Sequence, residues 1–213
     1  MARKKLFRIQ ESTVLENIIQ YDDPDAKKII EDFSKSTEKI ILELGCGRGE
    51  YTVGLARIFS DGHCIGMDVQ GERIWHGAKS ALEQKLENVL FLRGHIEQLS
   101  EYFAEQSVDQ IWIPFPDPFL REKKAKKRLT SPRFLTMYEK ILKQNGTVHL
   151  KTDNEVLYQF SKETVQNFGA KILLKNEELE LSQDPQSPFS IQTQYEKRYR
   201  AEGKNIFYLC FQF

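Results

Sequence analysis

From residue 39 to the C-terminus, short apolar runs alternate with longer runs that place an apolar residue every three or four positions. Short apolar runs are typical of strands, and the three-to-four spacing is typical of amphipathic helices. The expected strands cover residues 39–44, 63–68, 89–92, 108–113, 147–152, 171–174 and 206–211. The expected helices cover residues 25–33, 51–59, 73–85, 99–103, 132–142 and 155–168. This alternation predicts a Rossmann-like, doubly wound α/β fold with a mostly parallel sheet, and the alternating last run predicts an antiparallel C-terminal strand.

Length and composition limit the class of protein. The 213 residues are 40% hydrophobic and 29% charged, which suits one compact domain. We expect residues 1–35 to form a basic N-terminal arm with a leading helix and residues 36–213 to form the main domain. No apolar run approaches the roughly 20 residues that a membrane helix needs, and the basic N-terminus lacks the apolar core of a signal peptide.

The cysteines and histidines indicate neither a disulfide framework nor a metal centre. The three cysteines, an odd number without a CxxC pair, are typical of a protein in the reducing cytoplasm, where we expect this one. The four histidines have no metal-ligand spacing, so we expect no catalytic metal. A monomer and a homodimer both fit the sequence.

Positive charge is concentrated in one segment of a chain whose formal net charge is zero. Residues 121–128 contain six basic residues and one acidic residue, and residues 1–10 contain four basic residues and no acid. Segregated cations on a neutral protein indicate a local site for a polyanion. A solvated charged segment is the alternative interpretation.

The basic segment follows a strand end that is broken by two prolines, in the run IWIPFPDPFL. Proline fixes φ and removes an amide donor, so the strand must end here and continue as a shaped loop. Pro116 and Pro118 bracket Asp117. The loop therefore presents one carboxylate at the C-terminal edge of the sheet, where open α/β sheets bind their ligands.

A glycine-rich loop, ELGCGRG, follows the first expected strand of the main domain and opens a helix. Glycines let the backbone approach a ligand closely, and the amides at a helix start can face it. Glu43 stands just before the loop, and Asp68 ends the next strand, where a carboxylate can accept both hydroxyls of a ribose. A carboxylate at Glu43 is unfavourable beside a pyrophosphate but suits the cationic end of S-adenosylmethionine. NAD binding and a tight turn without a ligand are the alternatives.

Together these segments resemble the bacterial tRNA (guanine-N(7)-)-methyltransferase family. The motifs that carry the resemblance are, in chain order, ELGCGRGE, GMD, FPDPF with the following KKAKKRL, KTDN and TQYEKRYRAEG. The resemblance implies a class I methyltransferase fold with S-adenosylmethionine as methyl donor and S-adenosylhomocysteine as product. It also implies that the acceptor is the N(7) atom of a variable-loop guanine, nucleotide 46, in tRNA. The chain departs from the family's usual pattern at His95 and at residues 120–122.

The family's residue roles transfer to matching positions of this chain. Asp117 would be catalytic and would also line the cofactor pocket. The other cofactor-binding residues would be Glu43, Gly45, Gly47, Gly49, Asp68, His95 and Ile96. The residues that meet the target nucleotide would be Arg121, Asp153, Thr193, Gln194, Tyr195 and Glu196. The residues that grip the RNA would be Lys123, Lys124, Lys126, Lys127 and Arg128.

The chemistry of N(7) methylation fits this set of residues. The N(7) lone pair is nucleophilic without deprotonation, so no strong general base is needed, and alignment alone can supply roughly 7–11 kcal/mol of a barrier. Asp153 or Glu196 would hold the opposite edge of the guanine, with Phe119 or Tyr195 stacked on its face. The alternatives are that Asp153 caps the following helix and that the two aromatic residues only pack.

Two other functions remain open at this stage. Amino-group methyltransferases that act on DNA or protein use a D/N-P-P-aromatic turn, and this chain is one proline short of that motif at Asp117-Pro118-Phe119. An RNA-binding module that has lost catalysis would not need the intact glycine loop with Asp68 and Asp117.

Overall fold

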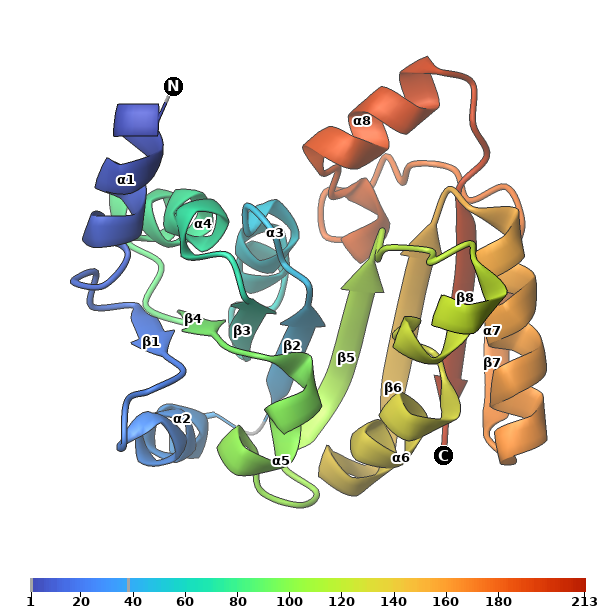
Figure 1. Ribbon diagram of the computed structural model, residues 1–213, viewed down its shortest axis with the longest axis horizontal. Helices are drawn as coiled ribbons and strands as arrows, with labels where there is room; N and C mark the ends of the chain where they lie inside the picture. The colour runs from blue at the N-terminus through green and yellow to red at the C-terminus, as the bar shows by residue number, and fades with distance from the viewer. Residues whose placement is uncertain (1, 38) are drawn as a thin grey trace.

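The computed structural model describes residues 2–37 and 39–213, which form a single sheet with helices on both faces (Figure 1). The strand order is β1-β4-β3-β2-β5-β6-β8-β7; β8 runs antiparallel to both of its neighbours, and the other pairs are parallel. The strands are β1 (Ile18–Gln20), β2 (Ile40–Leu44), β3 (His63–Asp68), β4 (Val89–Arg93), β5 (Val108–Pro114), β6 (Leu142–Thr152), β7 (Lys171–Asn176) and β8 (Phe207–Gln212). This order confirms the predicted doubly wound fold with an antiparallel C-terminal strand.

Two apolar layers enclose the sheet. The α-helices are α1 (Ala2–Glu11), α2 (Ala26–Lys35), α3 (Glu50–Ile58), α4 (Gly71–Glu83), α5 (Leu99–Tyr102), α6 (Pro132–Ile141), α7 (Glu155–Phe168) and α8 (Gln194–Ala201). Three short 3-10 helices are η1 (Ile96–Gln98), η2 (Glu122–Lys127) and η3 (Pro188–Ser190). One layer packs α2, α5, α6 and α7 on the sheet, and the other packs α3 and α4 on the opposite face. No helix in the described ranges is long and apolar enough to cross a membrane.

The first 35 residues carry more structure than an arm and one helix. β1 pairs with β4 and so adds a strand to the edge of the sheet, and α1 packs on α4. Trp75 of α4 donates a 2.5 Å hydrogen bond from Nε1 to Glu11, and Lys5 forms a 3.3 Å ion pair with Glu72. These contacts hold the basic N-terminal segment against the main domain.

The expected strand over 147–152 begins earlier in the structure. β6 starts at Leu142, which pairs with Val108, but the next paired positions are Gln110 and Thr147. The intervening bulge contains Asn145 with φ of 66° and Gly146, so the apolar pattern resumes only after it. A bulge shifts the register without changing the direction of the strand.

The strand order places the two predicted loops side by side. β2 lies between β3 and β5, where the direction of winding reverses. The carboxyl ends of β2 and β5 therefore open onto the same crevice, which is the usual ligand position of an open α/β sheet. The glycine loop follows β2, and the loop around Asp117 follows β5.

Candidate active site

The glycine loop is shaped by the end of β3. The amides of Gly45 and Cys46 both donate to the Met67 carbonyl, at 2.8 and 3.0 Å, and the Gly47 amide donates to Asp68 Oδ2 at 2.9 Å. Gly45 and Gly47 have φ of 72° and 54°, values that residues with a Cβ rarely adopt. Asp68 therefore holds the loop as well as facing the crevice.

Gly49 has a packing function rather than the predicted ligand contact. It precedes α3 with φ of 69°, and a Cβ there would lie 2.6 Å from the Phe91 ring and 2.9 Å from Gly77. The residue lets α3 and α4 approach each other closely, and it does not line the crevice.

Glu43 is a buried carboxyl at the floor of the crevice. Only 2% of its surface is exposed, and its Oε2 accepts a hydrogen bond from Thr52 Oγ1. Burial raises its pKa to about 8, against the opposing effect of the Thr52 hydrogen bond. At neutral pH this carboxyl is therefore mostly protonated in the free protein, and a cationic ligand beside it would favour its ionisation.

The loop after β5 is held in an unusual backbone conformation. Phe115 and Phe119 have φ of 53° and 40°, in the region where a side chain is strained. The Phe115 amide donates to the Lys151 carbonyl at 2.7 Å, and Asp117 Oδ1 accepts from the Phe119 amide at 3.0 Å. Asp117 itself is exposed at the tip of the loop, so its second oxygen can face a ligand.

Arg128, which the sequence predicts to grip RNA, is buried in this structure and fastens the loop. Only 6% of its surface is exposed. Its Nε and Nη2 donate to the carbonyls of Pro118 and Phe119 at 3.1 and 3.2 Å, and its guanidinium lies 4.4 Å from the Phe160 ring centroid. The planar fork of donors joins the two carbonyls that follow Asp117.

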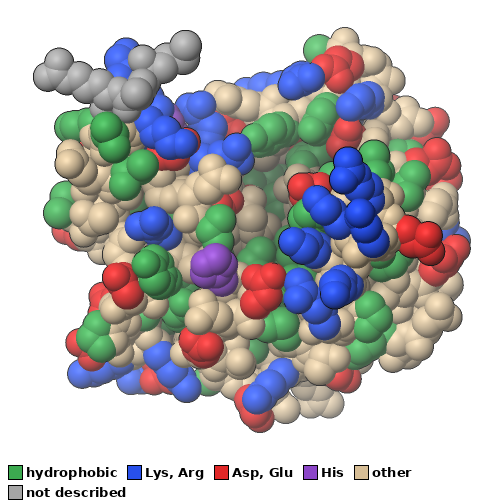
Figure 2. All heavy atoms as spheres, in the orientation of Figure 1, with side chains coloured by type: hydrophobic (Ala, Val, Ile, Leu, Met, Phe, Trp, Pro, Cys, Tyr) green, Lys and Arg blue, Asp and Glu red, His purple; other side chains and the backbone are tan. Residues whose placement is uncertain are grey.

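The 3-10 helix η2 carries four exposed lysines, as an RNA-binding role requires: Lys123, Lys124, Lys126 and Lys127. Figure 2 shows a hollow in this face of the molecule with Lys and Arg side chains gathered at its edge. Arg121, just before η2, is also exposed but does not line the crevice.

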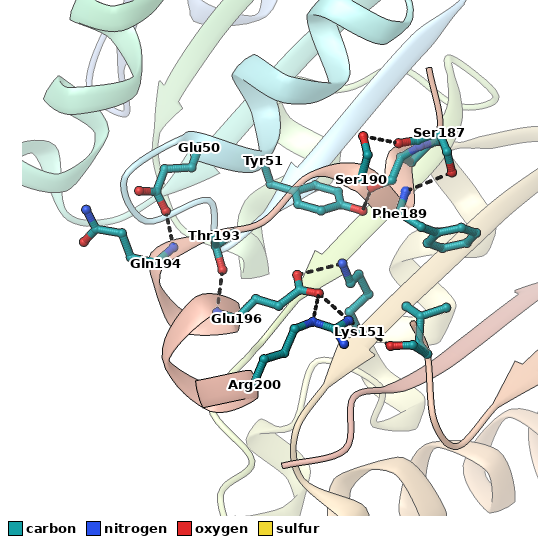
Figure 3. Close-up of polar contacts among 12 residues, drawn as sticks. Glu50, Tyr51, Lys151, Ser187, Phe189, Ser190, Thr193, Gln194, Glu196 and Arg200 are labelled. Carbon is teal, nitrogen blue, oxygen red and sulfur yellow. Dashed lines mark hydrogen bonds and ion pairs between the residues drawn. The ribbon is translucent and has the colours of Figure 1, made fainter. Parts of the chain in front are cut away.

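A buried ion-pair network positions α8 beside the crevice (Figure 3). Glu196 is fully buried, and its two oxygens accept from Lys151 Nζ at 2.8 Å and from Arg200 Nη2 at 2.8 Å. Arg200 also donates to the Leu179 carbonyl at 2.8 Å. Glu196, which the sequence predicts to contact the guanine, is therefore occupied by these partners and has no surface facing the crevice in this structure.

Further hydrogen bonds cap α8 and attach its start, and the preceding η3, to α3. Thr193 Oγ1 accepts from the Glu196 amide at 3.1 Å and so caps the helix, and the Gln194 amide donates to Glu50 Oε2 at 2.7 Å (Figure 3). Tyr51 donates from its hydroxyl to the Pro188 carbonyl at 3.0 Å. The segment that carries Thr193 and Tyr195 is thereby fixed over the glycine loop.

These elements enclose a cavity of about 620 Å³. Nine of the predicted residues line it: Glu43, Gly45, Gly47, Asp68, Ile96, Asp117, Lys127, Thr193 and Tyr195. Phe119 and Phe115 line it as well. The His95 side chain is exposed outside it, although the neighbouring Gly94 and Ile96 belong to its wall. Asp153 lies outside the wall and forms a 2.9 Å ion pair with Lys204.

Asp153 does not cap α7, which was the alternative interpretation. Asn154 Oδ1 accepts from the Leu157 amide at 2.9 Å and occupies the capping position. Asp153 is thus free of that structural task.

Tyr199, Glu50 and Arg73 also line the cavity and were not among the predicted site residues. Tyr199 stands one helical turn after Tyr195 on α8, and their ring centroids are 6.5 Å apart. Glu50 and Arg73 come from the first turns of α3 and α4. The spacing of the two tyrosines could have revealed Tyr199, because residues four apart share one face of a helix.

Comparison with known structures identifies the fold. An antibiotic-related methyltransferase superimposes with a TM-score of 0.67 at 18% identity, covering 87% of this chain and 93% of that chain. The 16S rRNA methyltransferase KamB gives a TM-score of 0.67 at 14% identity, covering 89% of this chain and 93% of that chain. The fold is that of the class I methyltransferases, as the resemblance implied.

Sequence comparison then gives the family. Residues 37–209 match a family model described as "Putative methyltransferase". The tRNA (guanine-N(7)-)-methyltransferase of Christiangramia forsetii is 41% identical, covering 99% of this chain and 98% of that protein. The corresponding protein of Cytophaga hutchinsonii is 39% identical and covers 100% and 99%. The chain belongs to the tRNA (guanine-N(7)-)-methyltransferase family, which confirms the predicted resemblance.

Proposed function

We propose that the protein transfers a methyl group from S-adenosylmethionine to the N(7) atom of a guanine in tRNA, with nucleotide 46 of the variable loop as the target. The observation that carries this function is one cavity that joins the glycine loop to the exposed carboxylate of Asp117, in a chain of this family. The reaction takes place in the cytoplasm, where tRNA is modified.

The residues of the cavity fit the proposed methyl donor. Glu43 offers a buried carboxyl to the cationic amino acid end, and Asp68 lies where ribose hydroxyls would be. Gly45 and Gly47 leave open space beneath a ligand, since an added Cβ would meet nothing closer than 4.0 Å. Apolar side chains of Ile96, Leu129 and Phe134 form part of the remaining wall. The donor supplies an electrophilic methyl group on a sulfonium, and Asp117 faces the opening through which an acceptor would approach.

The protein's task in this reaction is alignment. Guanine N(7) already carries a lone pair, so no residue has to remove a proton before the transfer. Asp117, on a loop fixed by Lys151 and Arg128, would orient the base and offset the positive charge that develops on it. The hydrogen bonds that maintain the strained φ values at Phe115 and Phe119 would hold the carboxylate in place before the substrate arrives.

The guanine is proposed to stack on aromatic side chains at the cavity mouth. Tyr195 is 45% exposed and lines the cavity together with Phe119 and Tyr199. Stacking of a base on an aromatic ring is worth about 1–3 kcal/mol. Asp153 would accept from the ring NH and amino group of the base in exchange for Lys204, since an exposed ion pair of this kind contributes only about 0–1 kcal/mol.

The direct test uses methyl-labelled S-adenosylmethionine and unmodified tRNA transcripts. Label is expected as 7-methylguanine, and only in transcripts that keep the variable-loop guanine. Label in another base, or in transcripts that lack this guanine, would contradict the proposal.

Substitution of Asp117 tests the catalytic assignment. Asp117→Asn keeps the hydrogen bond from the Phe119 amide, because the asparagine oxygen can accept it, but removes the negative charge. We expect the turnover number to fall by about 100-fold or more, the range seen when one electrostatic contact to a transition state is lost. Near-normal turnover would remove Asp117 from the mechanism.

A further inference from the structure

A second cationic surface borders the cavity on the side opposite η2. Four arginines from four parts of the chain converge there: Arg8 of α1, Arg48 of the glycine loop, Arg73 of α4 and Arg198 of α8. They line a groove of about 400 Å³, which we call the arginine groove. It shares Arg48, Arg73 and Tyr195 with the proposed active-site cavity. The two hollows are therefore continuous.

The charge in the arginine groove is largely uncompensated. Glu72 is the acidic residue in its lining, and this carboxylate already pairs with Lys5 at 3.3 Å. Arg198 pairs with Glu202 on the exposed side of α8, and Glu202 is also 3.5 Å from Lys204. Guanidinium groups that line one groove attract an anion and can donate several hydrogen bonds to it.

The position of Arg8 is fixed by packing. Its guanidinium carbon lies 5.5 Å from the Trp75 ring centroid, and Trp75 is itself held by the hydrogen bond to Glu11. α1 thus presents a cation at a defined place rather than on a free arm.

His76 lies among these arginines in the lining of the groove. Its Nδ1 lies 3.4 Å from Arg48 Nη2. Burial, followed by the charges of Arg48 and Arg8, lowers its pKa to about 4, so the ring is neutral at physiological pH. A neutral imidazole can accept from Arg48 and leave the other donors of that guanidinium directed to a ligand.

We propose that the arginine groove binds backbone phosphates of the tRNA strand that carries the target guanine. This inference rests on the proposed function. The strand crosses the cavity mouth, with one stretch of phosphates on η2 and another in the arginine groove, and the guanine turns inward between them toward Tyr195 and Asp117. Figure 2 shows Lys and Arg side chains on both sides of the hollow. Two anchored flanks would fix the position of the base along the strand, which a single basic patch cannot do.

The test is the double variant Arg8→Gln/Arg198→Gln. Both residues line the arginine groove but not the cofactor cavity, so cofactor binding should not change. Each lost phosphate contact should reduce the slope of log affinity against log salt by about 0.7–0.9, so tRNA should bind roughly 25- to 60-fold more weakly at 0.1 M salt and approach wild-type affinity near 1 M. The matched control is Lys27→Gln/Lys28→Gln, which removes two exposed cations from α2 at the other end of the strands (Figure 1).

The outcomes separate this inference from the function on which it rests. A salt slope equal to that of the control variant, in an enzyme that still methylates tRNA, would overturn the arginine groove alone. Weaker binding of S-adenosylmethionine with unchanged tRNA binding would assign the groove to the cofactor and also overturn it. A competition arm with inorganic phosphate distinguishes a free anion, since only a site for free phosphate would be blocked by millimolar phosphate at constant ionic strength. Failure of wild-type protein to methylate tRNA would count against the proposed function instead.

Discussion

At the scale of single residues, the site depends on groups whose protonation is changed by burial. Glu43 has a pKa of about 8 in the folded protein, whereas an unfolded chain leaves it near its ordinary value of 4.5. Between these values the folded state holds a proton that the unfolded state has lost. The free energy of unfolding therefore falls as the pH rises from about 4.5 through about 8, by an amount on the order of a few kcal/mol.

Glu43→Gln isolates this effect. Glutamine keeps an oxygen that can accept from Thr52 but cannot ionise, so the variant should lose the pH dependence that Glu43 contributes. We expect it to match wild type near pH 4, where the Glu43 carboxyl is protonated in both states, and to be the more stable protein near pH 8.5, as measured by urea unfolding without cofactor. Parallel stability profiles for the two proteins would show that the Glu43 carboxyl ionises normally in the fold.

A single side chain, Arg128, fastens the loop that carries Asp117. Arg128→Ala removes two charged hydrogen bonds to the Pro118 and Phe119 carbonyls, and each such bond is worth about 1.5–3 kcal/mol. We expect a loss of stability of about 3–6 kcal/mol and lower turnover, with no change in the salt slope of tRNA binding. Arg128→Lys keeps the charge but not the planar fork, so it should recover little.

The neighbouring Lys127 supplies the control for Arg128. It is exposed on η2, so Lys127→Ala should lower the salt slope and leave the stability unchanged. If Arg128→Lys behaved as wild type while Arg128→Ala changed only the salt slope, Arg128 would be an RNA contact after all.

At the scale of elements, α8 is held by a pair of buried charges. Loss of one partner of such a pair leaves the other charge buried and unpaired, which typically costs about 3–5 kcal/mol. Glu196→Gln should therefore destabilise the protein by about this amount, because Lys151 is fully buried and its burial already lowers its pKa. The double variant Lys151→Met/Glu196→Gln should regain part of the loss. Urea unfolding of wild type, Lys151→Met, Glu196→Gln and the double variant would measure it. Strictly additive effects would mean that the two charges do not stabilise each other.

The same helix shows where inference from sequence ends. The strand at His63–Asp68 and the helix at Glu155–Phe168 have the predicted bounds because their own apolar periodicity defines them. α8 has no such pattern: Glu196 is its buried residue, and the reason is a lysine 45 positions earlier in the chain. Local periodicity cannot detect a helix whose packing depends on a distant charge.

Some residues of the site could also be predicted from the sequence, and others could not. The positions of Glu43, Asp68 and Asp117 follow from strand ends and turn residues, and the structure brings all three to one cavity. The sequence pattern of the basic run could not distinguish Arg128 from its exposed neighbours, because only the fold directs its side chain to the Pro118 and Phe119 carbonyls. The sequence did not predict α1, because its basic residues are typical of an unattached arm. In the structure, contacts from Trp75 and Glu72 of α4 hold it in place.

At the scale of the whole molecule, net charge is zero, yet the cavity lies between two cationic surfaces. If both hold the same RNA strand, their contributions to the salt dependence should add. Replacing Lys123, Lys124, Lys126 and Lys127 by Gln should reduce the slope of log affinity against log salt by about 3, and adding Arg8→Gln/Arg198→Gln should reduce it by about 1.6 more. Filter-binding or anisotropy titrations from 50 to 500 mM salt, at fixed cofactor, would measure both steps. A second step that vanishes once the lysines are gone would mean that the arginine groove meets the RNA only after η2 has docked, so that the two surfaces act in sequence rather than as independent anchors.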